Sequence, residues 1–132
     1  MSEHGIQVTL PGGSRVDAQY RGFTISTDQP VHDGGTNTAP APFDLFLGSL
    51  ATCAGYYVLA FCRERQIPTA GITLSMTMER PQGAKLIAKI GIAIHLPAGF
   101  PDKYRTAVIK AADACAVKAH MMNPPAFEIT AD

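Results

Sequence analysis

The sequence predicts an α+β fold with the element order βββ-α-ββ-α-β and antiparallel strand pairing. Three short segments of alternating polar and apolar residues precede one long apolar helix, and two more such segments separate that helix from a second one. This order lacks the strict alternation of a parallel, doubly wound sheet. A chain of 132 residues suffices for one domain but not for two ordinary ones. We therefore expect a single domain over residues 1–132.

The first part of the chain predicts a β-meander that ends near Thr27. Turns are expected over Pro11–Ser14 and at Arg21-Gly22, where glycines interrupt the alternating pattern. A loop with three prolines and many small polar residues then extends from Asp28 to Pro42. Loops of this length in a compact domain often carry function.

The long central helix is expected from near Pro42 to about Glu64. Proline suits the first turn of a helix, Asp44 favours the positive end of the helix dipole, and Pro68 prevents continuation. The helix is apolar nearly all round, so we expect it to be covered on most sides. A domain of this size has too few elements to cover it, and a homodimer is therefore expected.

Two strands and a second helix follow. Alternation predicts strands over residues 72–78 and 86–96, joined by a turn at Pro81–Gly83. The second helix is expected from about Pro101 to about Lys118. After the break at Asn123-Pro124-Pro125, a short last strand is expected over Phe127–Thr130.

Composition argues against several function classes. Eleven basic residues balance eleven acidic ones, and no basic tract predicts a nucleic-acid partner. The most apolar stretch contains polar residues and ends in charges, so a buried helix suits it better than a membrane span. The N-terminus lacks the features of a signal peptide, and we expect a cytoplasmic protein. Neither the three cysteines nor the four histidines have metal-site spacing, and no cofactor motif is found.

Cys53 is the main candidate for chemistry, because a thiol midway along an uncharged helix is either a small core residue or a shielded nucleophile. It lies too deep in its helix for the N-terminal dipole to activate it, so an external cation would be needed. Cys115 extends the apolar stripe of the second helix, which fits a core residue as well as a resolving thiol. Cys62 points to the opposite side of the helix from Cys53, so a structural role is expected.

Two arginines and one carboxylate are further candidates. Arg15 and Arg21 precede the long loop, and surface arginines are usually solvated. Arg21 differs because it occupies the Tyr20-Arg21-Gly22 turn. Asp44 can be explained as an ordinary first-turn helix charge.

The chain resembles the OsmC/Ohr superfamily, named for osmotically inducible protein C and organic hydroperoxide resistance protein. The segment Ala41–Cys53 (APFDLFLGSLATC), preceded by Gly34-Gly35, is similar to that family's signature around its first cysteine. A second match is Ala114–Val117 (ACAV), which is similar to the end of the family's later helix. The resemblance in order and spacing covers nearly the whole chain.

The resemblance implies an OsmC-like fold and an intertwined homodimer with two interface sites. It implies that Cys53 is the peroxidatic cysteine and Cys115 the resolving one. Arg21 is the best match for the activating arginine, with Arg15 as the alternative. Asp44 is the only carboxylate near the helix start, where the family usually has a glutamate.

The expected function is a thiol-dependent peroxidase that reduces organic or hydrogen peroxides in oxidative-stress defence. It would need no cofactor and no metal, and an external dithiol such as a lipoyl protein would restore the cysteines. Apolar side chains near Cys53 favour organic hydroperoxides: Phe46, Leu50, Tyr56 and Tyr57. The alternative is an OsmC-like module that binds a small apolar ligand at the dimer interface without turnover.

Overall fold

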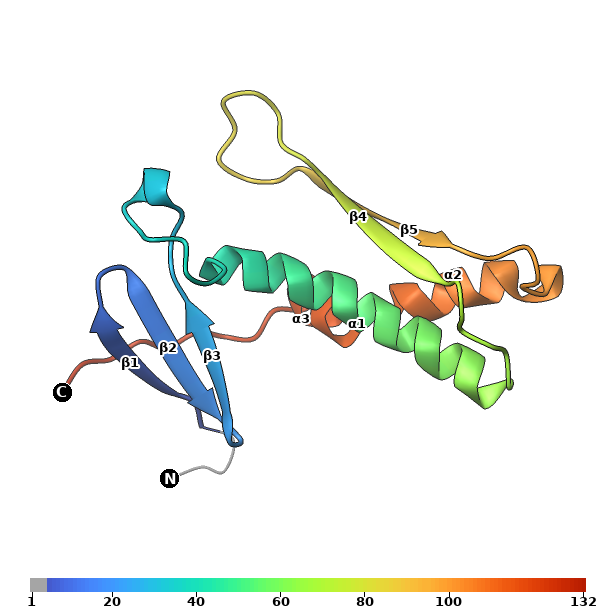
Figure 1. The fold of residues 1–132 in the computed structure, drawn as a ribbon, viewed down its shortest axis with the longest axis horizontal. Coiled ribbons are helices and arrows are strands. Elements are labelled where there is room, and N and C mark those ends of the chain that lie inside the picture. The colour runs from blue at the N-terminus through green and yellow to red at the C-terminus, as the bar shows by residue number, and fades with distance from the viewer. Residues whose placement is uncertain (1–4) are drawn as a thin grey trace. The chain divides into compact units, whose positions relative to one another are not determined.

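The computed structural model describes residues 5–132 and confirms the predicted α+β class (Figure 1). The chain divides into two compact units, of which the first ends at Gly48 and the second comprises Ser49–Asp132. The two units are described separately below. The single domain expected over residues 1–132 stays a prediction.

The first unit contains the predicted β-meander. Strands β1 (Gln7–Gly12), β2 (Arg15–Tyr20) and β3 (Phe23–Thr27) form an antiparallel sheet in the order β1-β2-β3. Arg21 and Gly22, between β2 and β3, have φ angles of 52° and 82°. A type I′ hairpin turn requires positive φ at both central residues, so this turn fixes the register of the hairpin.

The two faces of this sheet differ in polarity. The strand register places Arg15, Asp17 and Gln19 on one face, because alternate residues of a strand project to the same side. Their cross-strand neighbours on that face are also polar, namely Gln7, Thr9, Thr24 and Ser26. The other face contains the apolar set Val8, Val16, Ala18, Tyr20, Phe23 and Ile25.

The loop after β3 is organised around the buried carboxylate of Asp28, whose residue is only 1% exposed. The hydroxyl groups of Thr36 and Thr38 and the backbone N–H of Thr38 donate to Oδ2, and the backbone N–H of Gln29 donates to Oδ1. The loop includes a 3₁₀ turn, η1 (Val31–Asp33). These bonds hold the pKa of Asp28 well below its usual value, with Thr38 the largest contributor, against an opposing effect of burial.

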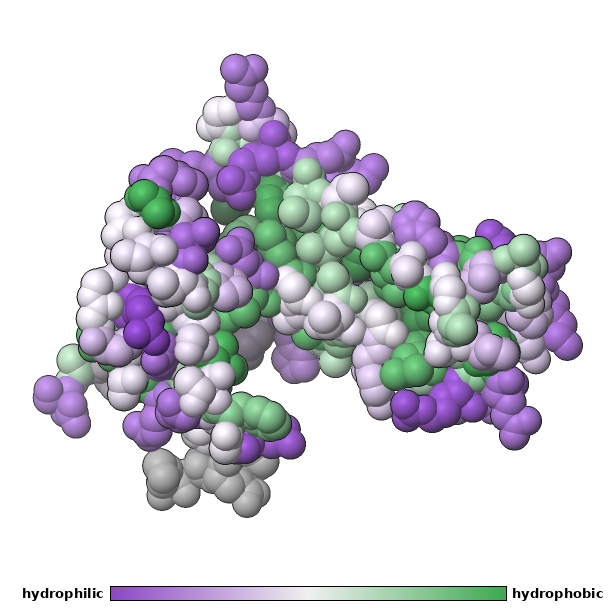
Figure 2. Space-filling view, viewed as in Figure 1, coloured by the Kyte–Doolittle hydropathy of each residue, from purple (hydrophilic) through white to green (hydrophobic). Residues whose placement is uncertain are grey.

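Helix α1 (Pro42–Glu64) has the predicted bounds. Its buried residues form one stripe with helical spacing: Leu50, Ala54, Val58, Phe61 and Cys62. One chain does not cover the helix on every side, as expected, since Phe43, Tyr56 and Leu59 on other faces are exposed; cover by a second copy stays a prediction. Hydrophobic side chains accordingly reach the surface at several places (Figure 2). Among the helices of residues 5–132, α1 alone has the length and composition of a membrane span, a property that core helices of soluble proteins share.

The second unit packs helices against a two-stranded sheet. Strands β4 (Thr73–Glu79) and β5 (Lys89–His95) pair antiparallel, with Met76 opposite Ile92. The second of these strands is shorter than the predicted segment 86–96. The core of the unit joins the buried stripe of α1 to residues from the later helices and their flanking loop, namely Phe100, Val108 and Ala112.

The prediction of one long second helix is wrong. A 3₁₀ turn, η2 (Asp102–Tyr104), leads into α2 (Arg105–Asp113), and α3 (Ala116–Met122) follows after a break. The break occurs because Cys115 has an extended backbone, with φ −56° and ψ 129°. Cys115 is therefore the N-cap residue of α3 rather than a member of one continuous stripe.

The predicted last strand over Phe127–Thr130 is also wrong for the single chain. In the described residues 5–132, the segment 123–132 has neither helix nor strand. Phe127 and Ile129 are 84% and 95% exposed. A strand needs a neighbour that accepts and donates its backbone hydrogen bonds, and residues 5–132 of one chain provide none for this segment.

Candidate active site

The second unit brings Cys53 and Cys115 together. Cys53 is half-buried on α1, and Cys115 is buried at the start of α3, where its residue is 4% exposed. The thiol of Cys115 donates a hydrogen bond to the sulfur of Cys53. No disulfide joins them, and all three cysteines are free thiols. The interaction shifts the pKa values of the two thiols in opposite directions.

The surroundings of Cys53 favour its thiolate. Burial by itself raises the pKa of Cys53, but hydrogen bonds from the Cys115 thiol and from the backbone N–H groups of Val117 and Ala116 outweigh it. The pKa of Cys53 is consequently lowered from its ordinary value. A lowered pKa increases the thiolate fraction, which is the nucleophilic form.

Cys115 has the opposite tendency. Burial raises its pKa, and the hydrogen bond to Cys53 raises it further, while the backbone N–H groups of Lys118 and Val117 oppose the change. The pair therefore consists of one sulfur that favours the thiolate and one that keeps its proton. Cys62 is fully buried in the core, where burial raises its pKa despite the charge of Arg65. This environment agrees with the structural role expected for Cys62.

Sequence reasoning missed the start of α3 as part of the site. The start of α1 at Pro42 is too distant from Cys53 to activate it, but free amides reach Cys53 from a different helix, α3. The segment Ala111–Lys118 contains no glycine or proline that would predict the break. Only the extended backbone of Cys115 turns the amides of Ala116 and Val117 toward Cys53.

An open apolar groove of about 870 Å³ in the second unit reaches Cys115. It is lined by residues of α1, β5, α2 and α3, and the lining includes the charged residues Lys89, Arg105 and Lys110. Of the four apolar residues predicted near Cys53, Leu50 lines this groove. The apolar lining is formed mainly by Ile87, Ile90, Ile92, Ile94, Leu96, Ile109, Met121 and Met122.

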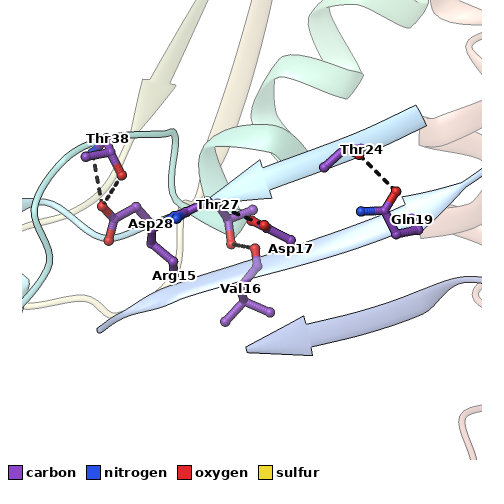
Figure 3. A network of polar contacts seen from close by, with 8 residues as sticks. All are labelled: Arg15, Val16, Asp17, Gln19, Thr24, Thr27, Asp28 and Thr38. Atoms are coloured by element: carbon purple, nitrogen blue, oxygen red, sulfur yellow. Dashed lines mark hydrogen bonds and ion pairs between the residues drawn. The ribbon is translucent and has the colours of Figure 1, made fainter. Parts of the chain in front are cut away.

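The remaining predicted site residues belong to the first unit. The guanidinium carbon of Arg21 lies 5.9 Å from the ring centroid of Tyr20. One nitrogen of Arg15 lies 3.4 Å from Oδ2 of Asp17 (Figure 3). Oδ2 of Asp44 accepts a hydrogen bond from the backbone N–H of Ala41 at 3.0 Å, which satisfies one free amide at the start of α1. The structure thus unites Cys53 with Cys115 and places Arg15, Arg21 and Asp44 in the other unit.

No group of three or more histidine, cysteine, aspartate or glutamate side chains lies close enough to hold a metal ion within residues 5–132. The cysteine pair can perform the chemistry of a thiolate beside a protonated thiol.

Similar structures have the same fold. A Psychrobacter arcticus protein, whose name proposes a role in osmotic stress induction and detoxification, is 28% identical, with a TM-score of 0.74 over 90% of this chain and 87% of that one. An OsmC-like protein from Mycoplasma pneumoniae is 16% identical, with a TM-score of 0.71 over 92% and 88%. An organic hydroperoxide resistance protein OsmC from Legionella pneumophila is 16% identical, with a TM-score of 0.58 over 88% and 86%.

A comparison with curated proteins gives no match. The model of the family described as OsmC-like protein matches residues 35–130, which include both Cys53 and Cys115. The chain belongs to the OsmC-like protein family.

Proposed function

We propose that this protein is a thiol-dependent peroxidase that reduces organic hydroperoxides through Cys53 and Cys115. The observation that carries the proposal is the hydrogen bond between the two sulfurs, with the pKa of Cys53 lowered and that of Cys115 raised. Family membership and the name of the Legionella neighbour support a redox or stress role. The peroxidase activity itself is our inference from the site.

The cycle begins with attack of the Cys53 thiolate on one oxygen of the peroxide. The O–O bond breaks, Cys53 becomes a sulfenic acid, and the departing alkoxide takes a proton to leave as an alcohol. The Cys115 sulfur then attacks the Cys53 sulfur, and the sulfenic oxygen leaves with protons as water. An external dithiol reduces the resulting disulfide by two exchange steps and is itself oxidised. The net reaction consumes one hydroperoxide and one dithiol.

An arginine would complete the site by stabilising the thiolate and by donating to the departing oxygen. The family resemblance favours Arg21, aimed by Asp44, and leaves Arg15 as the alternative. The Asp44 carboxylate already accepts the Ala41 amide at the start of α1. Asp44 can therefore act either by stabilising the start of α1 or by positioning the arginine, and mutation can distinguish the two roles.

The groove beside Cys115 supports an apolar substrate. Its lining is mostly isoleucine, leucine and methionine, which would bind the hydrocarbon part of an organic hydroperoxide. Hydrogen peroxide gains nothing from such a surface. We therefore expect cumene hydroperoxide to be consumed faster than hydrogen peroxide at equal concentrations.

A homodimer is part of the proposal. The apolar residues exposed on α1 and on the C-terminal segment, such as Tyr56, Leu59 and Phe127, would be covered by a second copy. The proposed partners are a peroxide and an external dithiol such as a lipoyl protein, and the proposed compartment is the cytoplasm.

The test measures loss of cumene hydroperoxide and of hydrogen peroxide with three reductants: dithiothreitol, a lipoyl protein and thioredoxin. Activity that disappears in Cys53→Ser, with the organic peroxide preferred, supports the proposal. Faster consumption of hydrogen peroxide would contradict the substrate class. A parent protein that is inactive with every reductant would contradict the peroxidase.

The open groove also favours a second candidate, a module that binds a small apolar ligand without turnover. Thiol reactivity separates the two functions. A catalytic Cys53 is alkylated rapidly below pH 7, whereas a merely structural thiol resists until the protein unfolds.

A further inference from the structure

We propose that the ion pair between Asp113 and Lys118 positions Cys115 for its attack on Cys53. The two charged side chains act through the backbone that carries Cys115, so both are positioning residues. The inference rests on the two-cysteine cycle proposed above and adds the residues that govern its second step. All the residues concerned belong to the second unit.

The ion pair bridges the break between α2 and α3. Asp113 is the last residue of α2, and Lys118 lies in the first turn of α3. Nζ of Lys118 donates a hydrogen bond to Oδ1 of Asp113 and forms an ion pair with it. Cys115 lies between these two residues in the chain. The contact therefore closes a short loop around Cys115.

The backbone at Cys115 lacks the residues that usually stabilise such a break. It is extended between two helices, and Cys115 occupies the N-cap position of α3. At this position Ser, Thr, Asp or Asn usually supplies an oxygen acceptor for the first-turn amides. A thiol is a weaker acceptor than these oxygens. A contact between side chains on the two sides of the break can stabilise it in place of the usual cap.

Each charge of the pair is unfavourable by itself. A negative charge at the C-terminal end of a helix and a positive charge at the N-terminal end both oppose the helix dipole. Asp113 ends α2 and Lys118 is the third residue of α3, so both have the wrong sign for their places. The two charges compensate for this only when they neutralise each other across the break. This placement supports a role for the pair rather than for either charge alone.

The ion pair is weak enough to adjust Cys115 without determining the fold. Asp113, Cys115 and Lys118 all line the groove described above. The side chains of Lys118 and Asp113 are 43% and 70% exposed. Exposed ion pairs contribute little free energy and are screened by salt. We therefore expect the pair to change the rate of the Cys115 step by about twofold to fivefold.

The test isolates the Cys115 step without any peroxide, by the use of the neutral disulfide dithiodipyridine. The Cys53 thiolate attacks this reagent, the reagent's S–S bond breaks, and one thiopyridone is released while the other half stays bound to Cys53. Cys115 loses its proton to solvent and attacks the Cys53 sulfur. This second step forms the Cys53–Cys115 disulfide and releases the second thiopyridone. Absorbance follows the two releases as two phases, and Cys115→Ser should lack the second phase.

Both Asp113→Asn and Lys118→Gln should slow the second phase by about twofold to fivefold at low salt. The parent should slow to the rate of these variants at about 1 M salt, where the pair is screened. The charge-exchanged variant Asp113→Lys/Lys118→Asp restores the pair and should recover the parent rate. Glu64→Gln is the matched control, because it removes the carboxylate of the exposed pair that Glu64 forms with Arg65 in the same unit.

The direction of the two effects separates positioning from a direct effect of charge. Loss of a nearby negative charge favours the Cys115 thiolate, so a charge effect alone would make Asp113→Asn faster and Lys118→Gln slower. Positioning predicts that both become slower, and that the double variant Asp113→Asn/Lys118→Gln is no slower than either. Unfolding by denaturant should change little, because each substitution removes a charge that opposes a helix dipole. A slower second phase with a large loss of stability would indicate a structural role instead.

A consequence for the peroxide reaction follows from a slower second step. The sulfenic acid on Cys53 then lasts longer and can react with a second peroxide to form sulfinic acid, which intact mass detects as a gain of about 32 mass units. Half of the protein should reach this state at about twofold to fivefold less cumene hydroperoxide in Asp113→Asn than in the parent.

Opposite effects of the two single substitutions, additive losses in the double variant, or an unchanged second phase would overturn the inference. A parent protein without a second phase would overturn it as well. If the parent reduces peroxides while the Asp113 and Lys118 variants keep the parent's second phase, the peroxidase function stands and this inference fails. If the parent reduces no peroxide but both variants slow the second phase, the peroxidase fails while the positioning of Cys115 stands.

Discussion

The thiol of Cys115 donates a hydrogen bond to the sulfur of Cys53, and the first-turn amides of α3 donate to the same sulfur. The two thiols are therefore unequal before any peroxide arrives. The sulfur that accepts three hydrogen bonds favours its thiolate, and the one that donates keeps its proton. This inequality assigns attack to Cys53 and resolution to Cys115 in the proposed cycle.

Replacing Cys115 by alanine removes one donor to Cys53. We expect the pKa of Cys53 to rise in Cys115→Ala, because the thiolate loses a hydrogen bond while its burial remains. Cys115→Ser is the matched variant, since its hydroxyl can still donate. The pH dependence of iodoacetamide alkylation measures both. Equal profiles in the two variants would mean that the Cys115 donor does not stabilise the thiolate.

Ala116→Pro tests the backbone donors of α3. Ala116 is the first residue of the helix, a position that favours proline, and Cys115 has the extended backbone that a residue before proline requires. The substitution therefore removes one N–H and leaves the helix intact. We expect the pKa of Cys53 to rise and the alkylation rate at neutral pH to fall severalfold. Ala116→Ser keeps the N–H and should resemble the parent.

The buried carboxylate of Asp28 predicts a loss of stability in acid. Its pKa is held below the ordinary value by Thr38, Gln29 and Thr36, so its contribution is complete above about pH 4, the usual pKa of an aspartate. That contribution is lost as the pH falls further toward the lowered pKa. Urea unfolding of the parent and of Asp28→Asn should therefore differ at pH 7 and converge in stronger acid. A difference that stays constant with pH would contradict the assignment.

Position 35 requires glycine because there is no room for a side chain there, and not because of its backbone torsion angles. A Cβ atom built there would lie 2.0 Å from the carbonyl oxygen of Gln29 and 2.8 Å from Oδ1 of Asp28. We expect Gly35→Ala to lower the free energy of unfolding by about 1–3 kcal/mol, the usual cost of overpacking. Gly99→Ala is the control, because its Cβ would meet nothing within 4 Å. Equal stabilities of the two variants by denaturant unfolding would refute the steric explanation.

The elements that local signals define were predictable. Proline at the helix start, Pro68 beyond its end and an apolar run in between define Pro42–Glu64 with the observed bounds. The glycine turns at Gly13 and Gly22 likewise define the first meander. In these segments the local preference and the final structure agree, so pattern alone suffices.

The break before α3 and the last segment were not predictable, for two different reasons. Neither Ala114 nor Cys115 is a residue that ends a helix. The extended backbone of Cys115 therefore depends on tertiary packing, which local sequence does not show. Phe127–Thr130 has a strand pattern, but strand formation depends on a neighbour that local sequence does not specify. The candidate site could not be predicted for the same reason as the break. The backbone N–H groups of Ala116 and Val117 are free to donate to Cys53 only because the helix is broken at Cys115.

The most direct test of the account is the intact mass of the reduced protein after one equivalent of cumene hydroperoxide. A Cys53–Cys115 disulfide should form, with loss of about two mass units and one cross-linked peptide after digestion. Cys115→Ser should instead stop at a sulfenic acid on Cys53, detected as a gain of about 16 mass units or as a dimedone adduct. A parent protein that keeps its reduced mass, or a disulfide that involves Cys62, would contradict the account.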